Sequence, residues 1–121
     1  MPDPIYWAGP IAGKPLELQR LPSGNVYIRY LPSGAALGSG SYLTIGTYPL
    51  AHAYAAVQKL AAQSPSLRIK LPRGGLAVVA KDRPTNIYLA YPKSNYQVEV
   101  FDPSAAAARS LVLSGKVARV R

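Results

Sequence analysis

The chain has 121 residues, and its 14 Lys and Arg against 5 Asp and Glu give a formal net charge of +9. This length supports one compact domain or two very small ones, and a hydrophobic fraction of 49% argues against disorder throughout. Without Cys, the chain has no disulfide, no thiolate metal site and no Cys nucleophile. The sequence has no apolar run of membrane-spanning length and no signal peptide, so we expect a soluble cytoplasmic protein, or a periplasmic one if a leader has been removed.

Residues 1–15 are rich in proline and predict an extended, irregular lead-in segment. The tetrapeptide Leu-Pro-Ser-Gly at 21–24 recurs at 31–34, and each copy is typical of a turn. Around these turns β-branched and aromatic residues predict a β-meander. Its expected strands are residues 16–21, 26–31 and 42–48.

Pro49 is expected to open a helix, because the first helical position tolerates a missing N–H. Ser64 and Pro65 then form a stop signal. Apolar residues recur between them at helical spacing and predict one buried face. That face is expected to contain Leu50, Tyr54, Val57 and Leu60 or Ala61.

The second half repeats this order. Residues 67–71 alternate apolar and basic, which predicts a strand with Arg68 and Lys70 on one face. Asp102 and Pro103 predict the N-cap and first residue of a second helix. The other expected elements are a turn at 72–75, a buried strand at 76–80, a hairpin of 86–91 with 96–101, a helix end near Gly115 and a short strand at 117–120.

The two halves also resemble each other in sequence. Residues 25–30 are similar to 86–91, and the strand alternation aligns Ile45 with Val100. The fold class is therefore predicted to be α+β, an antiparallel β-meander with two helices. We expect a single compact domain over residues 16–121. The sequence leaves open whether its halves, 16–64 and 66–121, are duplicated β-β-α units packed together.

No catalytic or metal-binding arrangement is recognisable. The single His52 has no Cys nearby, and a metal site needs three or four convergent ligands. The carboxylates supply no obvious acid–base pair; they are Asp3, Glu17, Asp82, Glu99 and Asp102. We therefore predict a non-enzymatic protein that needs no cofactor. A small basic ribonuclease toxin acting through Lys, Arg and Tyr is the most distant alternative.

The positive charge is densest over residues 68–83. Such an excess favours binding to a polyanion, because the binding releases condensed counterions, and nucleic acid is the commonest polyanion. A hairpin over 67–81 would project Arg68 and Lys70 from one face and Arg73 from its tip, as a ribbon that fits a major groove or lies against phosphates. A solvated edge that resists strand pairing is the alternative interpretation. The predicted phosphate contacts are Arg20, Arg29, Arg68, Lys70, Arg73, Lys81 and Arg83.

Nine Tyr stand against one Phe, and two pairs, Tyr27 with Tyr30 and Tyr88 with Tyr91, lie on predicted strands. A spacing of three residues places the members of each pair on opposite faces of a strand. They therefore cannot form one stacking platform, and one member of each pair is expected in the core.

Two resemblances to known families are present. Pro22-Ser23-Gly24, then VYIRY at 26–30 and LTIGTYP at 43–49 before an Ala-rich helix, resemble the N-terminal arm-binding domain of tyrosine-type phage integrases over residues 15–62. This resemblance implies a three-stranded sheet laid against duplex DNA and a protein of a mobile element.

Residues 42–63 and 96–115 are each similar to the strand, small-residue turn and helix of the sporulation-related (SPOR) repeat. This second resemblance implies an envelope module that binds peptidoglycan glycan strands.

We expect binding of duplex DNA, or RNA, through a basic β-sheet face. The alternatives are glycan or cell-wall polymer binding, an acidic protein partner, and a role as an accessory subunit of a larger assembly.

Overall fold

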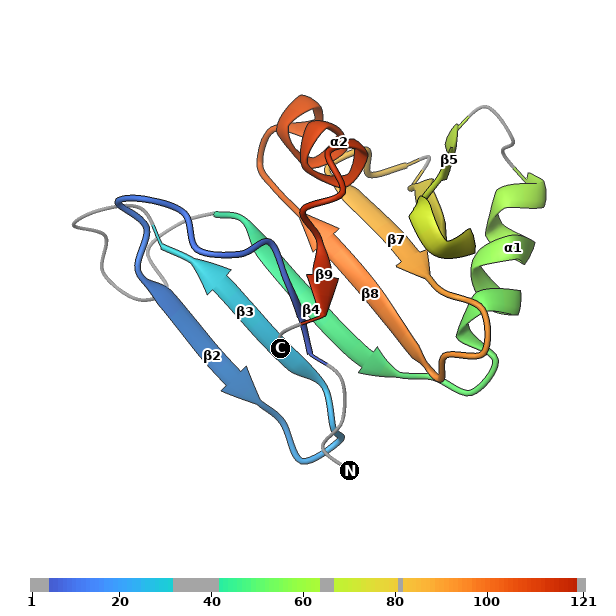
Figure 1. Cartoon of the computed structure of the whole chain (residues 1–121), viewed down its shortest axis with the longest axis horizontal. Coiled ribbons are helices and arrows are strands. Elements are labelled where there is room, and N and C mark those ends of the chain that lie inside the picture. The colour runs from blue at the N-terminus through green and yellow to red at the C-terminus, as the bar shows by residue number, and fades with distance from the viewer. Residues whose placement is uncertain (1–4, 32–41, 64–66, 81, 120–121) are drawn as a thin grey trace.

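Figure 1 shows the computed structural model of the chain, which describes residues 5–31, 42–63, 67–80 and 82–119. Within these residues two α-helices accompany a seven-stranded antiparallel sheet and a separate two-stranded ribbon. The predicted class, α+β with an antiparallel meander, is confirmed. None of the described helices combines the length and apolar character needed to cross a bilayer.

The first half of the sheet is the predicted three-stranded meander of β2 (Leu16–Arg20), β3 (Val26–Tyr30) and β4 (Thr44–Pro49). The turn between β2 and β3 is closed by Gly24, whose N–H donates to the carbonyl of Leu21 at 2.9 Å. Gly24 has a φ of 95°, a conformation that a residue with a side chain rarely adopts. The second Leu-Pro-Ser-Gly copy lies, apart from Leu31, outside the described residues.

The second half contains β5 (Arg68–Lys70), β6 (Leu76–Val79), β7 (Asn86–Ala90) and β8 (Tyr96–Phe101). The strand order across the sheet is β2-β3-β4-β8-β7-β6-β5. The halves therefore meet where β4 pairs with β8, and there Ile45 lies opposite Val100 with both side chains fully buried. Each half thus contributes a three-stranded meander followed by a helix, and β5 adds an edge strand to the second.

Helix α1 (Ala53–Gln63) packs on the sheet face that carries Leu76, Val78 and Ala90, called here the α1 face. The prediction that Pro49 opens this helix is wrong, because Pro49 is the last residue of β4. The chain first turns at His52, whose φ is 57°. The later start rotates the buried side, so Ala53, Val57 and Ala61 face the sheet. Leu50 is 38% exposed, contrary to expectation, and of the alternatives Leu60 and Ala61 it is Ala61 that is buried.

Helix α2 (Ala105–Leu113) packs on the opposite face, called here the α2 face, through Ala108 and Val112. Its N-cap is Ser104, whose hydroxyl accepts from the N–H of Ala107 at 3.2 Å. The prediction that Asp102 is the N-cap is therefore wrong by two residues. The Asp102 carboxylate instead accepts a hydrogen bond from the N–H of Ser104 at 2.8 Å. Asp102 therefore fixes the approach to the helix, and Pro103 precedes the cap.

The N-terminal segment belongs to the core, although the sequence predicts an irregular lead-in at 1–15. Strand β1 (Tyr6–Trp7) pairs with β9 (Ala118–Arg119), which confirms a short final strand. The Tyr6 N–H donates to the Thr47 hydroxyl at 3.1 Å, which fixes the ribbon to β4. Figure 1 shows β9 and the segment that precedes β2 crossing the first half of the sheet on the α2 face.

Tyr30 attaches this segment to the sheet. Its ring is fully buried, its hydroxyl accepts from the Ala8 N–H at 2.8 Å, and it donates to the Gly9 carbonyl at 2.9 Å. Tyr27, three residues earlier, is only half-buried on the α1 face. The expectation that one member of this pair is a core residue is therefore confirmed.

Candidate nucleic-acid interface

The predicted basic hairpin is present. Strands β5 and β6 pair with Arg68 opposite Val78 and Lys70 opposite Leu76, so both cations project on the α1 face. Both are exposed at the edge of the sheet. The hairpin closes through a short 3₁₀ turn, η2 (Pro72–Gly74), and Arg73 lies at its tip as predicted.

The remaining predicted contacts lie elsewhere. Arg83 follows β6 at its far end, beside Asp82 in a recess that Tyr88 also lines. Lys81 lies outside the described residues. Arg20 is exposed on β2, and β2 and β5 are the two opposite edges of the sheet. The seven predicted residues therefore do not form one continuous face.

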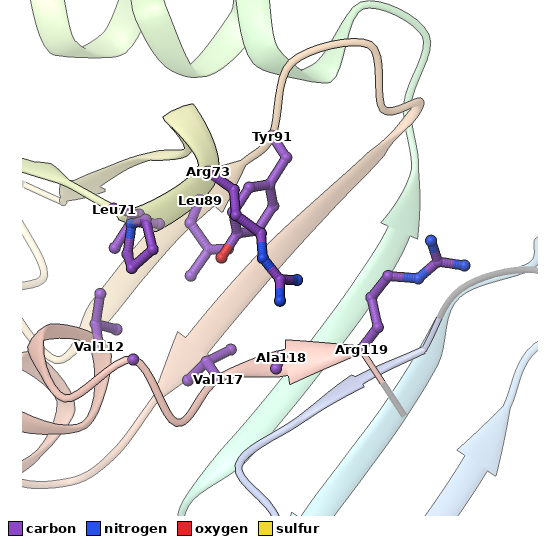
Figure 2. A pocket seen from close by; sticks show the side chains of 10 residues that line it. Leu71, Arg73, Leu89, Tyr91, Val112, Val117, Ala118 and Arg119 are labelled. Carbon is purple, nitrogen blue, oxygen red and sulfur yellow. The ribbon is translucent and has the colours of Figure 1, made fainter. Parts of the chain in front are cut away.

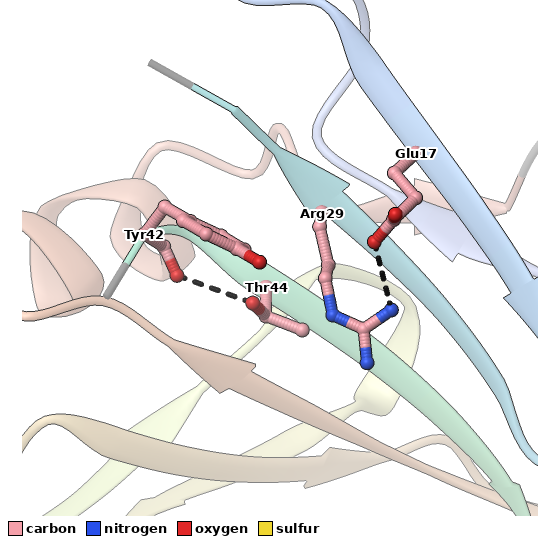
Figure 3. Close-up of polar contacts among 4 residues, drawn as sticks. All are labelled: Glu17, Arg29, Tyr42 and Thr44. Atoms are coloured by element: carbon pink, nitrogen blue, oxygen red, sulfur yellow. Dashed lines mark hydrogen bonds and ion pairs between the residues drawn. The ribbon is translucent and has the colours of Figure 1, made fainter. Parts of the chain in front are cut away.

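Arg29 is already paired. Its Nη1 lies 3.2 Å from Oε1 of Glu17 on the neighbouring strand (Figure 3). Its guanidinium lies 5.2 Å from the centre of the Tyr27 ring. Figure 3 also shows Tyr42 and Thr44 beside this pair, with the Thr44 hydroxyl donating to the Tyr42 carbonyl at 3.1 Å. The cation thus stabilises contacts within the sheet, and its charge is largely compensated.

The hairpin has no such compensation. The Arg29–Glu17 pair is the one salt bridge formed within the described ranges. Lys93, in the turn between β7 and β8, extends the charge, because its neighbour Pro92 packs against Gly74 of the hairpin tip. These exposed cations of the hairpin and the neighbouring turn form a surface that we call the basic corner; its members are Arg68, Lys70, Arg73 and Lys93.

On the first half of the sheet no described helix or strand covers the α1 face, and this part of the face, called here the open face, carries a hydrogen-bonded network around Glu99. Its Oε1 accepts from the Tyr48 hydroxyl at 2.6 Å, and its Oε2 accepts from the Asn86 amide at 2.5 Å. Gly46 makes room for this arrangement, because a Cβ there would lie 2.6 Å from the Tyr48 hydroxyl oxygen. Burial, then the hydrogen bond to Glu99, raises the pKa of Tyr48 far above its usual range, so the phenol stays neutral.

A pocket of about 480 Å³ opens on the α2 face between η2, the end of β7, α2 and β9. Figure 2 shows the side chains of Arg73 and Arg119 extending from η2 and from β9 at this pocket. Its apolar lining includes Leu71, Leu89, Val112 and Val117. Tyr91 completes the lining and stacks on Tyr6, with ring centroids 6.1 Å apart and planes 7° from parallel.

Sequence reasoning missed this pocket. Arg119 and Tyr6 become neighbours through the pairing of β1 with β9, two strands of two residues each. The sequence does predict a strand at 117–120. It does not indicate the partner of that strand, because the proline-rich residues around Tyr6 predict an irregular segment.

Comparison of the chain with models of protein families, with curated proteins and with solved structures found no match. Within the described ranges there is no group of three or more His, Cys, Asp or Glu side chains that could hold a metal ion.

Proposed function

We propose that this protein is a non-enzymatic module that binds duplex DNA through the basic corner. The observation that carries the proposal is that the carboxylates Glu17 and Glu99 are engaged away from the cations of the corner. The cations of the corner have no salt-bridge partner among the described residues, whereas Glu17 is paired with Arg29 and Glu99 lies in the Tyr48 network. Unpaired cations at one edge gain most from displacing the counterions of a polyanion.

The binding mode follows from the residue types. Arg and Lys on an exposed hairpin edge contact phosphates, which positions the protein without reading the base sequence. Arg68 and Lys70 lie two residues apart on one face of β5, and Arg73 extends the charge around the hairpin tip. The proposed interaction is therefore sequence-independent or weakly specific.

The open part of the α1 face supports such contacts less well. Its Arg29 is compensated by Glu17, and Glu99 adds a negative charge at its centre. Duplex DNA would have to displace the ion pair before Arg29 could contact a phosphate. The proposed interface therefore lies on the second half of the sheet, away from the segment that resembles the integrase domain.

A salt titration of labelled duplex DNA tests the proposal. Affinity is expected to fall linearly with salt on logarithmic axes, with a slope of about −0.9 for each phosphate contacted. The double variant Arg68→Glu, Lys70→Glu should bind at least about tenfold more weakly and show a slope reduced by about two. Arg20→Glu, on the opposite edge strand, is the matched control and should retain nearly native affinity.

Parallel assays separate the other partners. Duplex RNA tests whether the A-form helix is preferred, and a peptidoglycan pull-down tests the glycan alternative. Retention on peptidoglycan without DNA binding at low salt would overturn the proposal in favour of an envelope module. Native affinity of the double variant would show that the interface lies elsewhere.

A further inference from the structure

The pocket at the basic corner combines an apolar interior with a cationic rim. Leu89 and Val112 are almost fully buried, and they come from the sheet and from α2 respectively. Leu71 and Val117 contribute from the hairpin and from the segment before β9. A volume of about 480 Å³ is within the range of small-molecule sites and accommodates one ring system.

Two arginines from elements far apart in the sequence line the pocket. Arg73 belongs to η2 and Arg119 to β9, and neither forms a salt bridge within the described ranges. Each guanidinium offers a planar set of N–H donors that matches the oxygens of a phosphate. Two such groups suit a phosphate monoester, which carries nearly two negative charges at neutral pH, better than a single carboxylate.

The backbone at Arg73 is held in an unusual conformation. Its φ is 63°, between Pro72 and a Gly74 whose φ is 77°. Glycine adopts this region at little cost, whereas a residue with a Cβ is strained there. The turn itself therefore does not require an arginine, and strained side-chain-bearing residues concentrate at functional sites. The position contributes its guanidinium to the rim at the expense of backbone strain.

Tyr91 adds a neutral donor to the pocket lining, and Tyr6 stacks on its ring. Burial raises the pKa of Tyr91, and it also raises the pKa of Tyr6, an effect that the nearby Arg119 and Arg73 partly oppose. Both phenols therefore remain protonated at neutral pH and keep an O–H to donate. Tyr91 supplies one wall of the pocket, where a donor lies next to an aromatic surface, and its ring stacks on Tyr6.

We propose that this pocket binds a phosphate monoester with a planar apolar body, as in a mononucleotide, with the phosphate held by Arg73 and Arg119 and the body packed on Leu89, Val112 and Val117. The monoester could come from a free nucleotide or from the 5′-phosphorylated end of a strand. The site stands apart from the duplex contact proposed above, with which it shares Arg73.

Titration with phenyl phosphate and adenosine 5′-monophosphate, followed by NMR shifts of the backbone amides, tests the site. Both probes should shift amides of η2, the end of α2 and β9, and inorganic phosphate should bind at least about tenfold more weakly because it lacks the apolar body. Equal affinity for inorganic phosphate, or shifts confined to other elements, would overturn the proposal.

Substitutions at the rim make the test sharper. Arg73→Gly removes the guanidinium and suits the left-handed φ, so the variant should fold and bind phenyl phosphate about tenfold more weakly. Arg119→Gln should have a similar effect. Arg109→Gln, an exposed cation of α2 that lines a different recess, is the matched control and should bind as the native protein does. Native affinity in both rim variants would refute the assignment.

Two comparisons separate this site from duplex binding and identify the source of the phosphate. Arg68→Glu, Lys70→Glu should lose duplex DNA while keeping phenyl phosphate, and loss of both ligands in that variant would contradict two separate sites. A 5′-phosphorylated single strand that displaces phenyl phosphate, when its 5′-hydroxyl counterpart does not, would assign the site to strand ends. Displacement by adenosine 5′-monophosphate alone would assign it to free nucleotides.

Discussion

The two halves of the sheet have the same order of elements but different surroundings. Strand β7 is covered by α1 on one face and by α2 on the other, and α1 also covers β6. Among the described residues, strands β3 and β4 are covered on the α2 face only, by the segment around Tyr6 and Ala8. The difference arises because α1 follows β4 in the chain but packs against β6 and β7, in the second half of the sheet. The path of one connection, rather than the order of the elements, therefore decides which surface stays open.

The two halves also differ in whether their cations form salt bridges. The first half compensates its cation within the sheet, through Arg29 and Glu17. The second half leaves Arg68 and Lys70 exposed on β5 without a salt-bridge partner in the described ranges. The polar groups of the open face therefore contact one another within the fold, whereas the cations of the basic corner form no salt bridge among the described residues.

The largest expected effect on stability concerns the segment around Tyr6 and Ala8, which packs on the first half of the sheet. Tyr30→Ala should lower the free energy of unfolding by about 4 kcal/mol, since it removes a buried ring and the hydrogen bonds to Ala8 and Gly9. Val57→Ala, beneath α1 on the second half, removes a smaller side chain and should cost about 2 kcal/mol. Urea denaturation measures both. A smaller loss at Tyr30 than at Val57 would contradict the claim that this segment is integral to the core.

An intermediate effect concerns the network on the open face. Burial raises the pKa of Tyr48 above its unfolded value, so this phenol contributes stability that is present below about pH 10 and is lost as the pH rises toward the folded pKa. Tyr48→Phe should cost about 1.5 kcal/mol at neutral pH, because the hydrogen bond to Glu99 is lost.

The same variant should lose less of its remaining stability above pH 10 than the native protein. Denaturant unfolding at neutral and alkaline pH measures this difference. Tyr6, Tyr30, Tyr88 and Tyr91 also have raised pKa values, so the alkaline loss should be reduced rather than abolished. An unchanged alkaline loss would show that Tyr48 ionises without straining the fold.

The smallest expected effect is at Arg29. Because the Arg29–Glu17 pair is partly exposed, Arg29→Gln should change the free energy of unfolding by less than about 1 kcal/mol. Duplex affinity should stay within about twofold, since a compensated cation releases few counterions. Filter binding beside Arg68→Glu, Lys70→Glu makes the comparison direct. A loss at Arg29 equal to that of the double variant would place the interface on the open face, as the integrase resemblance implies.

Local patterns predicted much of the sheet. Alternation in residues 26–30 predicts the burial of Val26, Ile28 and Tyr30, and the apolar run at 76–79 predicts a fully buried strand. These features follow from side-chain periodicity, which acts over a few residues and needs no knowledge of the rest of the fold.

Features that depend on distant partners could not be predicted. The spacing of Leu50 and Leu60 suggests a larger helical face, but the close packing of α1 on β6 selects the smaller side chains of Ala53 and Ala61. Likewise, the sequence does not show which of the seven predicted cations lie on a common face. Their separation depends on the strand order, which places Arg20 and Arg68 at opposite edges. The pocket rim depends on β1 and β9, which are too short to show periodicity.

The pairing of β4 with β8 has a consequence for how the chain folds. The central contact of Ile45 with Val100 joins residues 55 positions apart, 100 − 45 = 55. Closing so long a loop carries an entropic cost before any contact offsets it, which slows the folding of sheets with distant partners. Until that step, each half presents an unpaired edge with apolar side chains. A partly folded chain is therefore expected to associate through β4 or β8 with a second copy of itself.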